Sequence, residues 1–248
     1  MSSKKIYFAS DFHLGSNNSE KSRSREEKII HWLDTIEKDA DEIYLVGDIF
    51  DFWFEYKYTI PKGAVRFQAK IASLIENGIN IYFFTGNHDM WMFNYFEREI
   101  GVKIYRKPIE KEIYGKKFFI GHGDGLGPGD RKYKLIKRVF SNPFCQWLFE
   151  RIHPNLGFYI AHSWSNKSRK KDSNRDNYFM GEEKEFLIQF CKEELKKKEI
   201  DFFIFGHRHL PIDYSINNQS KYINLGDWIK YNTYAVYDGK EIKLEKFS

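Results

Sequence analysis

The feature that most constrains the fold is a hydrophobic strand followed at once by polar residues of metal-binding types. The run Ile79–Phe84 predicts a buried strand, and Asn87 and His88 follow it on the loop at its carboxyl end. Ligand sites gather at this edge of an open α/β sheet. Four other stretches have the same form: Asp11-Phe12-His13, Gly47-Asp48-Ile49-Phe50-Asp51, Gly121-His122-Gly123-Asp124 and Gly206-His207-Arg208-His209.

Strands and amphipathic helices alternate along the first hundred residues, which predicts a parallel core, and later hairpins add antiparallel strands. Helices are expected over 25–38, 63–77, 92–99 and 181–198, with a loop over 14–24 and a tight turn at Gly115-Lys116 between two strands. The alternation stops after His122, where a Gly-rich connector leads into a basic helical stretch over 131–152, which Pro143 divides. We therefore predict an α/β (α+β) core over 1–129 and 181–248, with a helical cap inserted over 130–180.

Length and cysteine content place the chain in a broad class. A chain of 248 residues can bury a full core as one domain with an insertion. Cys145 and Cys191 belong to no recognisable motif, so no disulfide framework is expected and we predict a cytoplasmic protein. The sequence starts without the apolar segment of a signal peptide, and it contains no run of 18 apolar residues.

The charge is unevenly distributed. The whole chain has a formal net charge of +5, but residues 131–175 contain eleven Lys or Arg against Glu150 and Asp172, a balance of +9. The rest of the chain therefore has a formal net charge of −4. This asymmetry predicts that 131–175 faces an anionic partner or surface.

Each of the five motifs is weak evidence alone, but together and in this order they resemble the calcineurin-like, or binuclear, metallophosphoesterases. The resemblance implies an αββα sandwich that binds two divalent metal ions at the strand ends and hydrolyses phosphoesters. It assigns the first metal to Asp11, His13 and His209. It assigns the second metal to Asn87, His122 and His207, with Asp48 bridging both.

The chemistry of these side chains agrees with that assignment. Mixed imidazole nitrogens and carboxylate or amide oxygens suit Mn, and also Fe or Zn. A carboxylate such as Asp48 can bridge two cations that lie roughly 3.5–4 Å apart. His88 is surplus to the ligand count, so we predict that it protonates the leaving oxygen or stabilises the transition state. Asp51 or Asp89 is expected to orient it.

Within the superfamily, size and layout are similar to the UDP-2,3-diacylglucosamine pyrophosphatases of lipid A biosynthesis, which insert a helical lid at this point. That resemblance implies cleavage of the acylated sugar nucleotide to UMP and diacylglucosamine 1-phosphate, at the anionic inner surface of the cytoplasmic membrane. The lid residues expected to hold the head group are Ser163, Asn166, Lys167, Arg169 and Lys170. The chain departs from the best-known member by carrying His88 in place of Arg and Asp51 in place of Glu.

Several alternatives stay open at this point. The apolar residues at helical spacing in this stretch, Leu135, Val139, Trp147 and Leu148, favour core packing over membrane contact. The aromatic run 52–56 favours packing over a role as a wall of the substrate pocket. The substrate could be another nucleotide or phosphodiester, and the basic strip would also suit a nucleic-acid-processing enzyme, although Trp147 and Phe149 stand among apolar residues and not among basic ones. A non-catalytic scaffold would be expected to lack some of the seven ligands.

Overall fold

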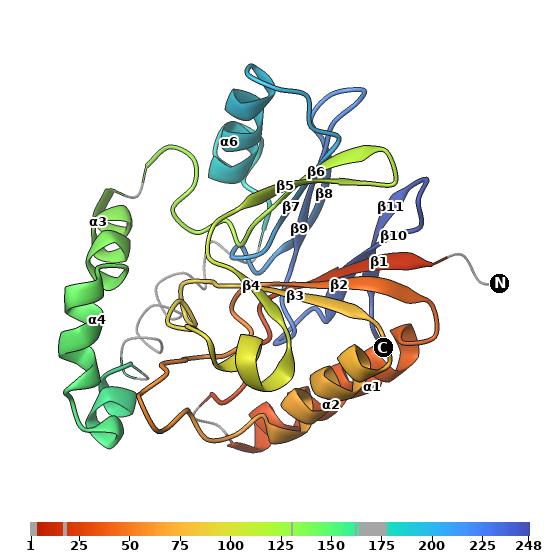
Figure 1. The fold of residues 1–248 in the computed structure, drawn as a ribbon. Helices are drawn as coiled ribbons and strands as arrows, with labels where there is room; N and C mark the ends of the chain where they lie inside the picture. Colours follow the sequence, from red (N-terminus) through yellow and green to blue (C-terminus); the bar gives the residue numbers. More distant parts are fainter. Residues whose placement is uncertain (1–3, 17–18, 130, 162, 164–177) are drawn as a thin grey trace.

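The computed structural model describes residues 4–16, 19–129, 131–161, 163 and 178–248. Its strands form two sheets (Figure 1). One contains β1 (Lys5–Ala9), β2 (Ala40–Val46), β3 (Asn80–Phe84), β4 (Lys103–Tyr105), β10 (Thr233–Tyr237) and β11 (Ile242–Lys246). The other contains β5 (Ile109–Ile113), β6 (Lys116–Ile120), β7 (Phe202–Phe205), β8 (Pro211–Ser215) and β9 (Lys221–Leu225). The helices include α1 (Ser19–Ile36), α2 (Val65–Glu76), α3 (Arg131–Phe140), α4 (Pro143–Glu150), α6 (Phe186–Leu195) and the π-helical turn η1 (Phe96–Ile100), and residues 154–161 are also helical.

Both sheets combine parallel and antiparallel strands, with antiparallel pairing at the β11 edge of the first sheet and at both edges of the second. The first has the order β11-β10-β1-β2-β3-β4, in which β1 to β4 are parallel. The second has the order β5-β6-β7-β9-β8, in which β6, β7 and β9 are parallel. The predicted parallel core with added antiparallel strands is therefore confirmed.

The layers follow from the alternation of side chains along each strand. In β1, Ile6 and Phe8 point into a core between the two sheets, whereas Tyr7 and Ala9 point to the core under the helices. The helices α1 and α2 cover the outer face of the first sheet, and α6 covers the outer face of the second (Figure 1). The fold is thus the expected αββα sandwich.

The helices α3 and α4 lie to one side of this sandwich, beyond the strand ends (Figure 1). The break at Pro143 is confirmed, and Asn142 caps α4 by accepting a hydrogen bond from the N–H of Phe144. Aromatic contacts join α3 and α4 to the core: the ring of Trp91 lies 5.5 Å from that of Phe140 and 4.7 Å from that of Phe149. Among the described helices, none is long and apolar enough to cross a membrane.

Four local expectations were wrong, and each error has a physical cause. α1 begins at Ser19 and not at residue 25, because its first turns are polar and carry no hydrophobic period. α6 begins at Phe186 and not at 181, because Gly181 opens a turn with a φ of 89°. The segment predicted as a helix over 92–99 contains the π-helical turn η1. The tight turn between β5 and β6 is formed by Tyr114 and Gly115, both with positive φ, and not by Gly115 and Lys116.

Candidate metal centre

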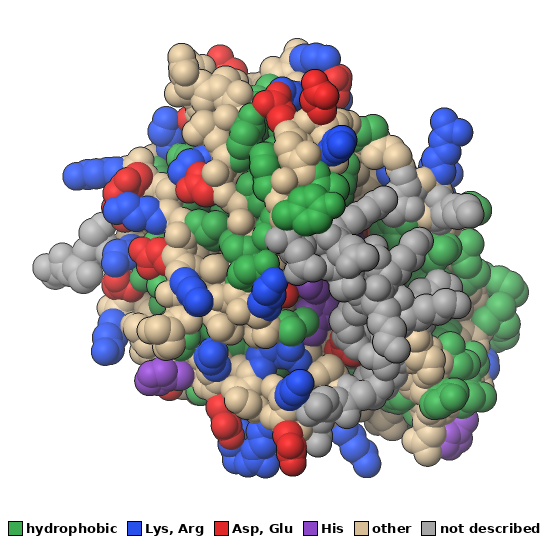
Figure 2. Space-filling view, turned by 180° about the vertical axis from the view of Figure 1, so that it is seen from behind, with side chains coloured by type: hydrophobic (Ala, Val, Ile, Leu, Met, Phe, Trp, Pro, Cys, Tyr) green, Lys and Arg blue, Asp and Glu red, His purple; other side chains and the backbone are tan. Residues whose placement is uncertain are grey.

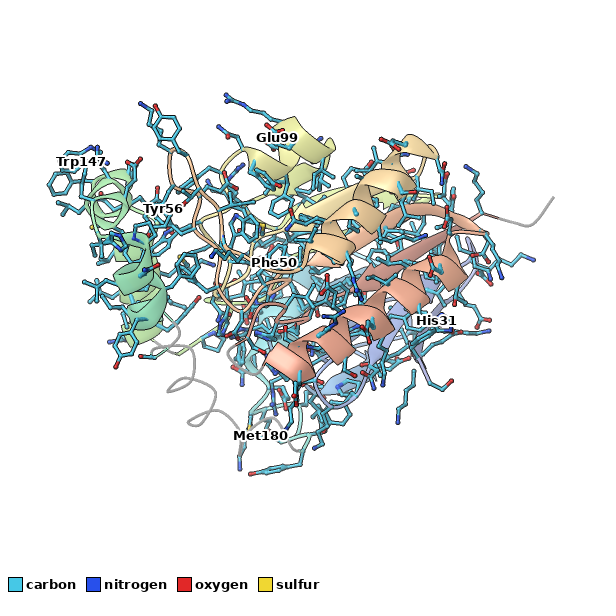
Figure 3. The ribbon with its side chains drawn as sticks, turned by 90° about the horizontal axis from the view of Figure 1, so that it is seen from below. His31, Phe50, Tyr56, Glu99, Trp147 and Met180 are labelled. Atoms are coloured by element: carbon cyan, nitrogen blue, oxygen red, sulfur yellow. The ribbon has the colours of Figure 1, made fainter. Side chains whose placement is uncertain are left out.

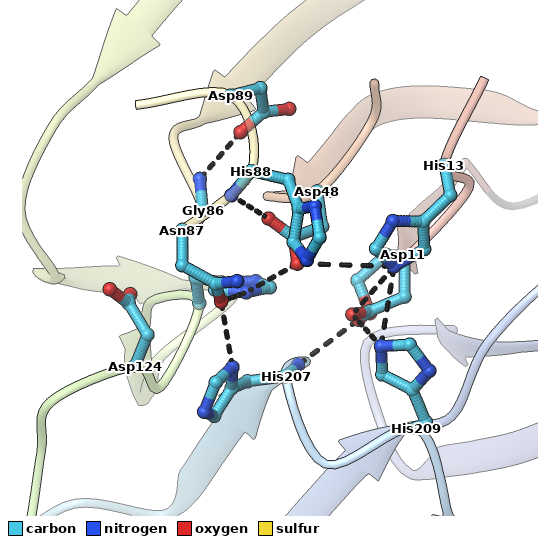
Figure 4. Close-up of polar contacts among 12 residues, drawn as sticks. Asp11, His13, Asp48, Gly86, Asn87, His88, Asp89, Asp124, His207 and His209 are labelled. Atoms are coloured by element: carbon cyan, nitrogen blue, oxygen red, sulfur yellow. Dashed lines mark hydrogen bonds and ion pairs between the residues drawn. The ribbon is translucent and has the colours of Figure 1, made fainter. Parts of the chain in front are cut away.

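The five predicted loops meet at one edge of the sandwich. β1, β2 and β3 of the first sheet and β6 and β7 of the second are each followed by a motif, and parallel strands end on the same side. The loops are joined by backbone hydrogen bonds, from the N–H of His13 to the carbonyl of Asp48 (3.0 Å) and from the N–H of Gly206 to the carbonyl of His122 (3.0 Å). Figure 4 shows the resulting cluster, which joins both sheets.

The backbone is unusual at these positions. Asp11, His13, Asp48, His207 and His209 all have positive φ, between 26° and 65°. Residues with a Cβ rarely adopt this conformation, and it persists where the surrounding structure fixes it, often at functional sites. Five of the seven predicted ligands therefore share the left-handed backbone conformation, which ends the extended course of the preceding strand.

Close approach of the loops explains two of the motif glycines. A Cβ on Gly86 would lie 2.2 Å from Asp48 Oδ1, and a Cβ on Gly206 would lie 2.5 Å from Asp11 Oδ2. Both distances are far below van der Waals contact, so only glycine lets the carboxylates approach these loops. The strand-end glycines are thus part of the geometry of the cluster.

The first group of donors converges from the three loops that follow β1, β2 and β7. His13 Nε2 lies 3.2 Å from His209 Nε2, 3.8 Å from Asp11 Oδ1 and 3.9 Å from Asp48 Oδ2. His209 Nε2 also lies 3.2 Å from Asp11 Oδ1. One donor atom from each of the four residues lies within 4.8 Å of the others.

The second group shares Asp48 with the first. Asn87 Oδ1 lies 3.2 Å from His122 Nε2 and 2.9 Å from His207 Nδ1. Asp48 Oδ2 is 3.3 Å from His122 Nε2, so this single oxygen lies between the two groups. The other oxygen, Oδ1, accepts the backbone N–H of His88 at 2.8 Å, which fixes the carboxylate in this orientation.

These distances suit metal coordination. Ligand bonds of about 2.0–2.2 Å place neighbouring ligands of one metal roughly 3.0–3.5 Å apart. The separations in the two groups, 2.9 to 3.9 Å, are close to that range. The donors are imidazole nitrogens and carboxylate or amide oxygens, a set that suits divalent transition metals. The residues present therefore fit two neighbouring cations.

Partners on the far side of three of the four imidazoles fix their orientation. His122 donates Nδ1–H to the carbonyl of Val46 at 2.8 Å, which directs Nε2 into the cluster. His13 Nδ1 lies 3.5 Å from Asp51 Oδ1, and His209 Nδ1 lies 3.4 Å from Asp227 Oδ2. Such contacts are typical of metal-binding histidines. Sequence reasoning missed Asp227, although it follows the strand β9 just as the five motifs follow theirs.

Opposite charges hold the cluster together. Burial disfavours the ionised form of Asp11, but His209 and His13 outweigh it and hold the pKa of that carboxyl well below its usual range. Burial likewise opposes protonation of His122, but Asp48 raises its pKa to about 10. Burial lowers the pKa of His207 to about 4, with His122 acting in the same direction.

The carboxylate of Asp89 connects two loops. Its Oδ1 accepts the N–H of Gly86 at 2.7 Å, and its Oδ2 accepts those of Ile49 (2.7 Å) and Phe50 (3.2 Å). Burial, helped by Asp48, raises the pKa of Asp89 to about 7. These contacts hold the loops of Asp48 and Asn87 against each other, which is a different role from the expected orientation of His88.

His88 is held by the loop that follows β2. Its Nδ1 lies 3.0 Å from the carbonyl oxygen of Asp51, so Nδ1 carries a proton and donates it to that hydrogen bond. Asp51 therefore contacts His88 through its backbone, while its carboxylate faces His13. The ring of His88 packs edge-on against that of His13, with centroids 4.8 Å apart.

A cavity of about 280 Å³ opens beside the cluster, between the core and the helices α3 and α4. Asp51, Asn87 and His88 line its end at the cluster. The remaining lining residues are mostly apolar or aromatic: Phe52, Met90, Trp91, Tyr133, Ile136, Lys137, Phe140, Phe149, Ile152, Ile160 and Ala161. In the run 52–56, Trp53 and Phe54 are buried as expected, whereas Phe52 forms part of this wall.

The predicted head-group residues are described only in part. Ser163 is exposed, and Asn166, Lys167, Arg169 and Lys170 lie outside the described residues. The expectation that Leu135, Val139, Trp147 and Leu148 are core residues was wrong, since all four are exposed. The cause is that α3 and α4 use only their inner faces to contact the sandwich, and the outer faces remain uncovered. In Figure 3, Trp147 extends outward from α4.

Comparison with known proteins agrees with this geometry. The family model described as calcineurin-like phosphoesterase matches residues 4–211. A Porphyromonas gingivalis protein named UDP-2,3-diacylglucosamine hydrolase is 40% identical, covering 97% of this chain and 97% of its own length. A protein of the same name from Actinobacillus succinogenes is 29% identical, covering 90% of this chain and 92% of its own.

Among solved structures, the phosphoesterase Yfce from E. coli aligns with a TM-score of 0.44 at 12% identity, covering 98% of this chain and all of its own. A dimetal phosphatase from Danio rerio aligns with a TM-score of 0.46 at 11% identity, covering the whole of both chains. Because the family model spans most of the sequence, and because its motif residues meet in one cluster, the chain belongs to the calcineurin-like phosphoesterase family.

Proposed function

We propose that this chain hydrolyses the diphosphate of UDP-2,3-diacylglucosamine to UMP and 2,3-diacylglucosamine 1-phosphate. The names of its full-length relatives support this substrate. The observation that carries the proposal is that the cluster of metal-binding side chains opens directly onto an apolar cavity, because Asp51, Asn87 and His88 belong to its lining. A diphosphate at the cluster would place an attached acyl chain within reach of that cavity.

The proposal assigns the two metals as the motifs imply, with Asp11, His13 and His209 on the first and Asn87, His122 and His207 on the second. Asp48 would be shared through Oδ2. When bound, divalent cations such as Mn²⁺ supply positive charge for the phosphoryl oxygens and activate water as the nucleophile. The chain itself contributes donors that are already oriented, because each loop is fixed before the substrate arrives.

We assign the inserted residues 130–180 to a lid that selects the substrate. The metal cluster alone would accept many phosphodiesters, so selection has to come from contacts outside it. Two contacts support the attachment of α3 beside the cluster: Tyr133 donates to Asp124 Oδ2 at 2.5 Å, and Lys137 Nζ lies 2.6 Å from the same oxygen. Asp124 is buried two residues after His122, so α3 is held close to the site.

The substrate assignment is tested with a panel of UDP-2,3-diacylglucosamine, deacylated UDP-glucosamine, cyclic nucleotides, phosphoproteins and single-stranded DNA, each with Mn²⁺. We expect rapid release of UMP from the acylated sugar nucleotide alone. Equal turnover of the acylated and deacylated compounds would contradict the proposal. Preferential cleavage of DNA would instead move the assignment to a nucleic-acid-processing enzyme.

Filling the cavity should impair the acylated substrate selectively. Ile136→Trp places a larger side chain where we locate an acyl chain. Displacing about three methylene groups, at about 0.8 kcal/mol each, would lower kcat/KM roughly 60-fold. Hydrolysis of bis-p-nitrophenyl phosphate should be unchanged, because this small ester needs only the cluster.

The matched control is Leu135→Trp, one position along α3. Its side chain is 60% exposed and does not line the cavity, so both activities should remain. An Ile136→Trp enzyme with full activity on the acylated substrate would contradict the assignment of the cavity. An equal loss on the small ester would show that the substitution had disturbed the cluster instead.

We also propose that the outer surface of α3 and α4 binds the inner face of the cytoplasmic membrane, where an acylated substrate would lie. Exposed apolar side chains on it include Leu135, Val139, Phe144, Trp147 and Leu148. Figure 2 shows hydrophobic side chains gathered along the edge where these helices lie. Exposed cations on the same helices, Arg131 and Arg138, would attract anionic lipids, and the balance of +9 over 131–175 has the same sign.

Removing two of these apolar side chains should weaken membrane binding. We expect Phe144→Ser with Trp147→Ser to lower binding to phosphatidylglycerol vesicles by at least 10-fold, because burial of each side chain contributes about 1.5–3 kcal/mol. Cosedimentation measures the bound fraction. Val65→Ser is the control, since Val65 is also exposed but lies on α2. Vesicle binding that is equal in both variants and the parent protein would rule out this surface.

A further inference from the structure

Arg208 lies between two predicted ligands, His207 and His209, and yet takes no part in the cluster. Only 4% of its surface is exposed. A buried guanidinium is costly unless its charge is paired and its N–H groups are hydrogen-bonded. Its partners therefore indicate what the residue does for the loop that carries it.

The guanidinium forms a fork with one carboxylate. Arg208 donates from Nε to Glu185 Oε2 and from Nη2 to Glu185 Oε1, both at 3.2 Å. Glu185 is 1% exposed and directly precedes α6, so the pair is shielded from water. A two-point contact of this kind fixes direction as well as distance.

Arg208 and Glu185 also form hydrogen bonds with the chain segment that follows the insertion. Arg208 Nη2 also donates to the carbonyl of Tyr178 at 3.0 Å, and Glu185 Oε1 accepts the N–H of Met180 at 3.1 Å. The segment 178–185 is thereby attached to the loop of His207 and His209. In Figure 3, Met180 marks where this segment runs along the periphery of the molecule.

The loop needs such support because its backbone is strained. His207 and His209 have φ values of 65° and 26°, on either side of Arg208. The N–H of His207 donates to Asp11 Oδ2 at 3.1 Å, which holds the loop from the side of the cluster. The fork of Arg208 on Glu185 is a second contact on the same loop, so the two imidazoles are placed by contacts to Asp11 and to Glu185.

We infer that Arg208 is a positioning residue, whose fork with Glu185 sets the placement of His207 and His209 and thereby the metal affinity of the site. The inference rests on the proposed two-metal function. It also makes metal affinity depend on the segment 178–185, which connects the insertion to α6. Arg208 would touch neither metal nor substrate, and would act only through the two histidines.

The test measures Mn²⁺ affinity without any substrate, by electron paramagnetic resonance titration of metal-free protein. Arg208→Lys keeps the charge but loses the fork, and we expect 10- to 100-fold weaker binding, as is usual when a contact behind a metal ligand is lost. Glu185→Gln should weaken binding to a similar degree. The double variant should be no weaker than the worse single variant, because both substitutions remove one interaction.

Lys198→Met is the matched control, because it breaks an ion pair with Glu110 near the opposite end of α6 and should leave Mn²⁺ affinity unchanged. Absorption spectra of bound Co²⁺ should change in the Arg208 and Glu185 variants alone. If Arg208→Lys does not fold, Glu185→Gln tests the same contact, because glutamine keeps the size and shape of the glutamate side chain. Wild-type Mn²⁺ affinity in variants that merely unfold at lower temperature would overturn the inference and leave the proposed function intact. Failure of the proposed function would be recognised separately, because the parent protein itself would then bind no Mn²⁺ or would not cleave UDP-2,3-diacylglucosamine.

Discussion

Asp48→Asn is expected to abolish phosphoester hydrolysis and to remove bound metal at the same time. The carboxylate is shared by both halves of the cluster, with Oδ2 at 3.9 Å from His13 Nε2 and 3.3 Å from His122 Nε2. The substitution keeps size and leaves an oxygen to accept the N–H of His88, but removes the negative charge. A neutral amide holds two neighbouring cations far less well than a carboxylate, so both should be lost together.

Anomalous scattering and elemental analysis measure this outcome. The parent protein should contain two metal ions roughly 3.5–4 Å apart, with Asp48 between them. The control is Asp201→Asn, at the opposite end of β7, where the carboxylate binds Lys116 and the backbone of Lys117. That variant should keep both metals and full activity. Two undiminished metals in Asp48→Asn, or one metal in the parent protein, would contradict the assignment.

The site could be predicted from the sequence as far as its residues follow strands. β3 ends before Asn87 and His88, and β6 ends before His122, so hydrophobic runs and the glycines after them were enough to bring these side chains to one edge. The parallel core with added antiparallel strands followed from the same runs, whereas the αββα layering was implied by the resemblance to the family. The position of the site could be predicted because the hydrophobic pattern and the direction of each strand can be read locally from the sequence. These two properties determine where the carboxyl ends of the strands lie.

The remaining features depend on contacts between distant segments. Asp89 holds two loops through backbone N–H groups, a role that residue type does not reveal. Asp227 contacts the imidazole of His209 only because folding brings these two residues together. Arg208 acts on its neighbours His207 and His209 through its contact with Glu185, which is also distant in the sequence. The exposure of Trp147 depends on which face of α4 packs against the core, whereas its spacing in the sequence is the same for a buried and an uncovered helix.

His88→Ala is expected to lower kcat by a factor of about 10² to 10⁴, which is the usual contribution of a general acid, while both metals stay bound. Metal retention follows from the geometry: Asp48 Oδ1 accepts the backbone N–H of residue 88, and that contact does not need the imidazole. The side chain lies at the junction of the cluster and the apolar cavity, where the leaving group of the proposed substrate would be. Its Nδ1–H is held by the carbonyl of Asp51, so the ring has a defined orientation.

Two further variants separate chemistry from packing. His88→Phe keeps a ring against His13 but lacks nitrogen, so it should be as slow as His88→Ala if the imidazole acts on the reaction. His88→Arg supplies a cation to stabilise the transition-state charge, and should recover part of kcat. Near-normal turnover by His88→Phe would show that the ring only supports His13. Loss of metal from His88→Ala, measured by elemental analysis, would instead place His88 among the ligands, and the role of Asn87 beside it would then have to be reassigned.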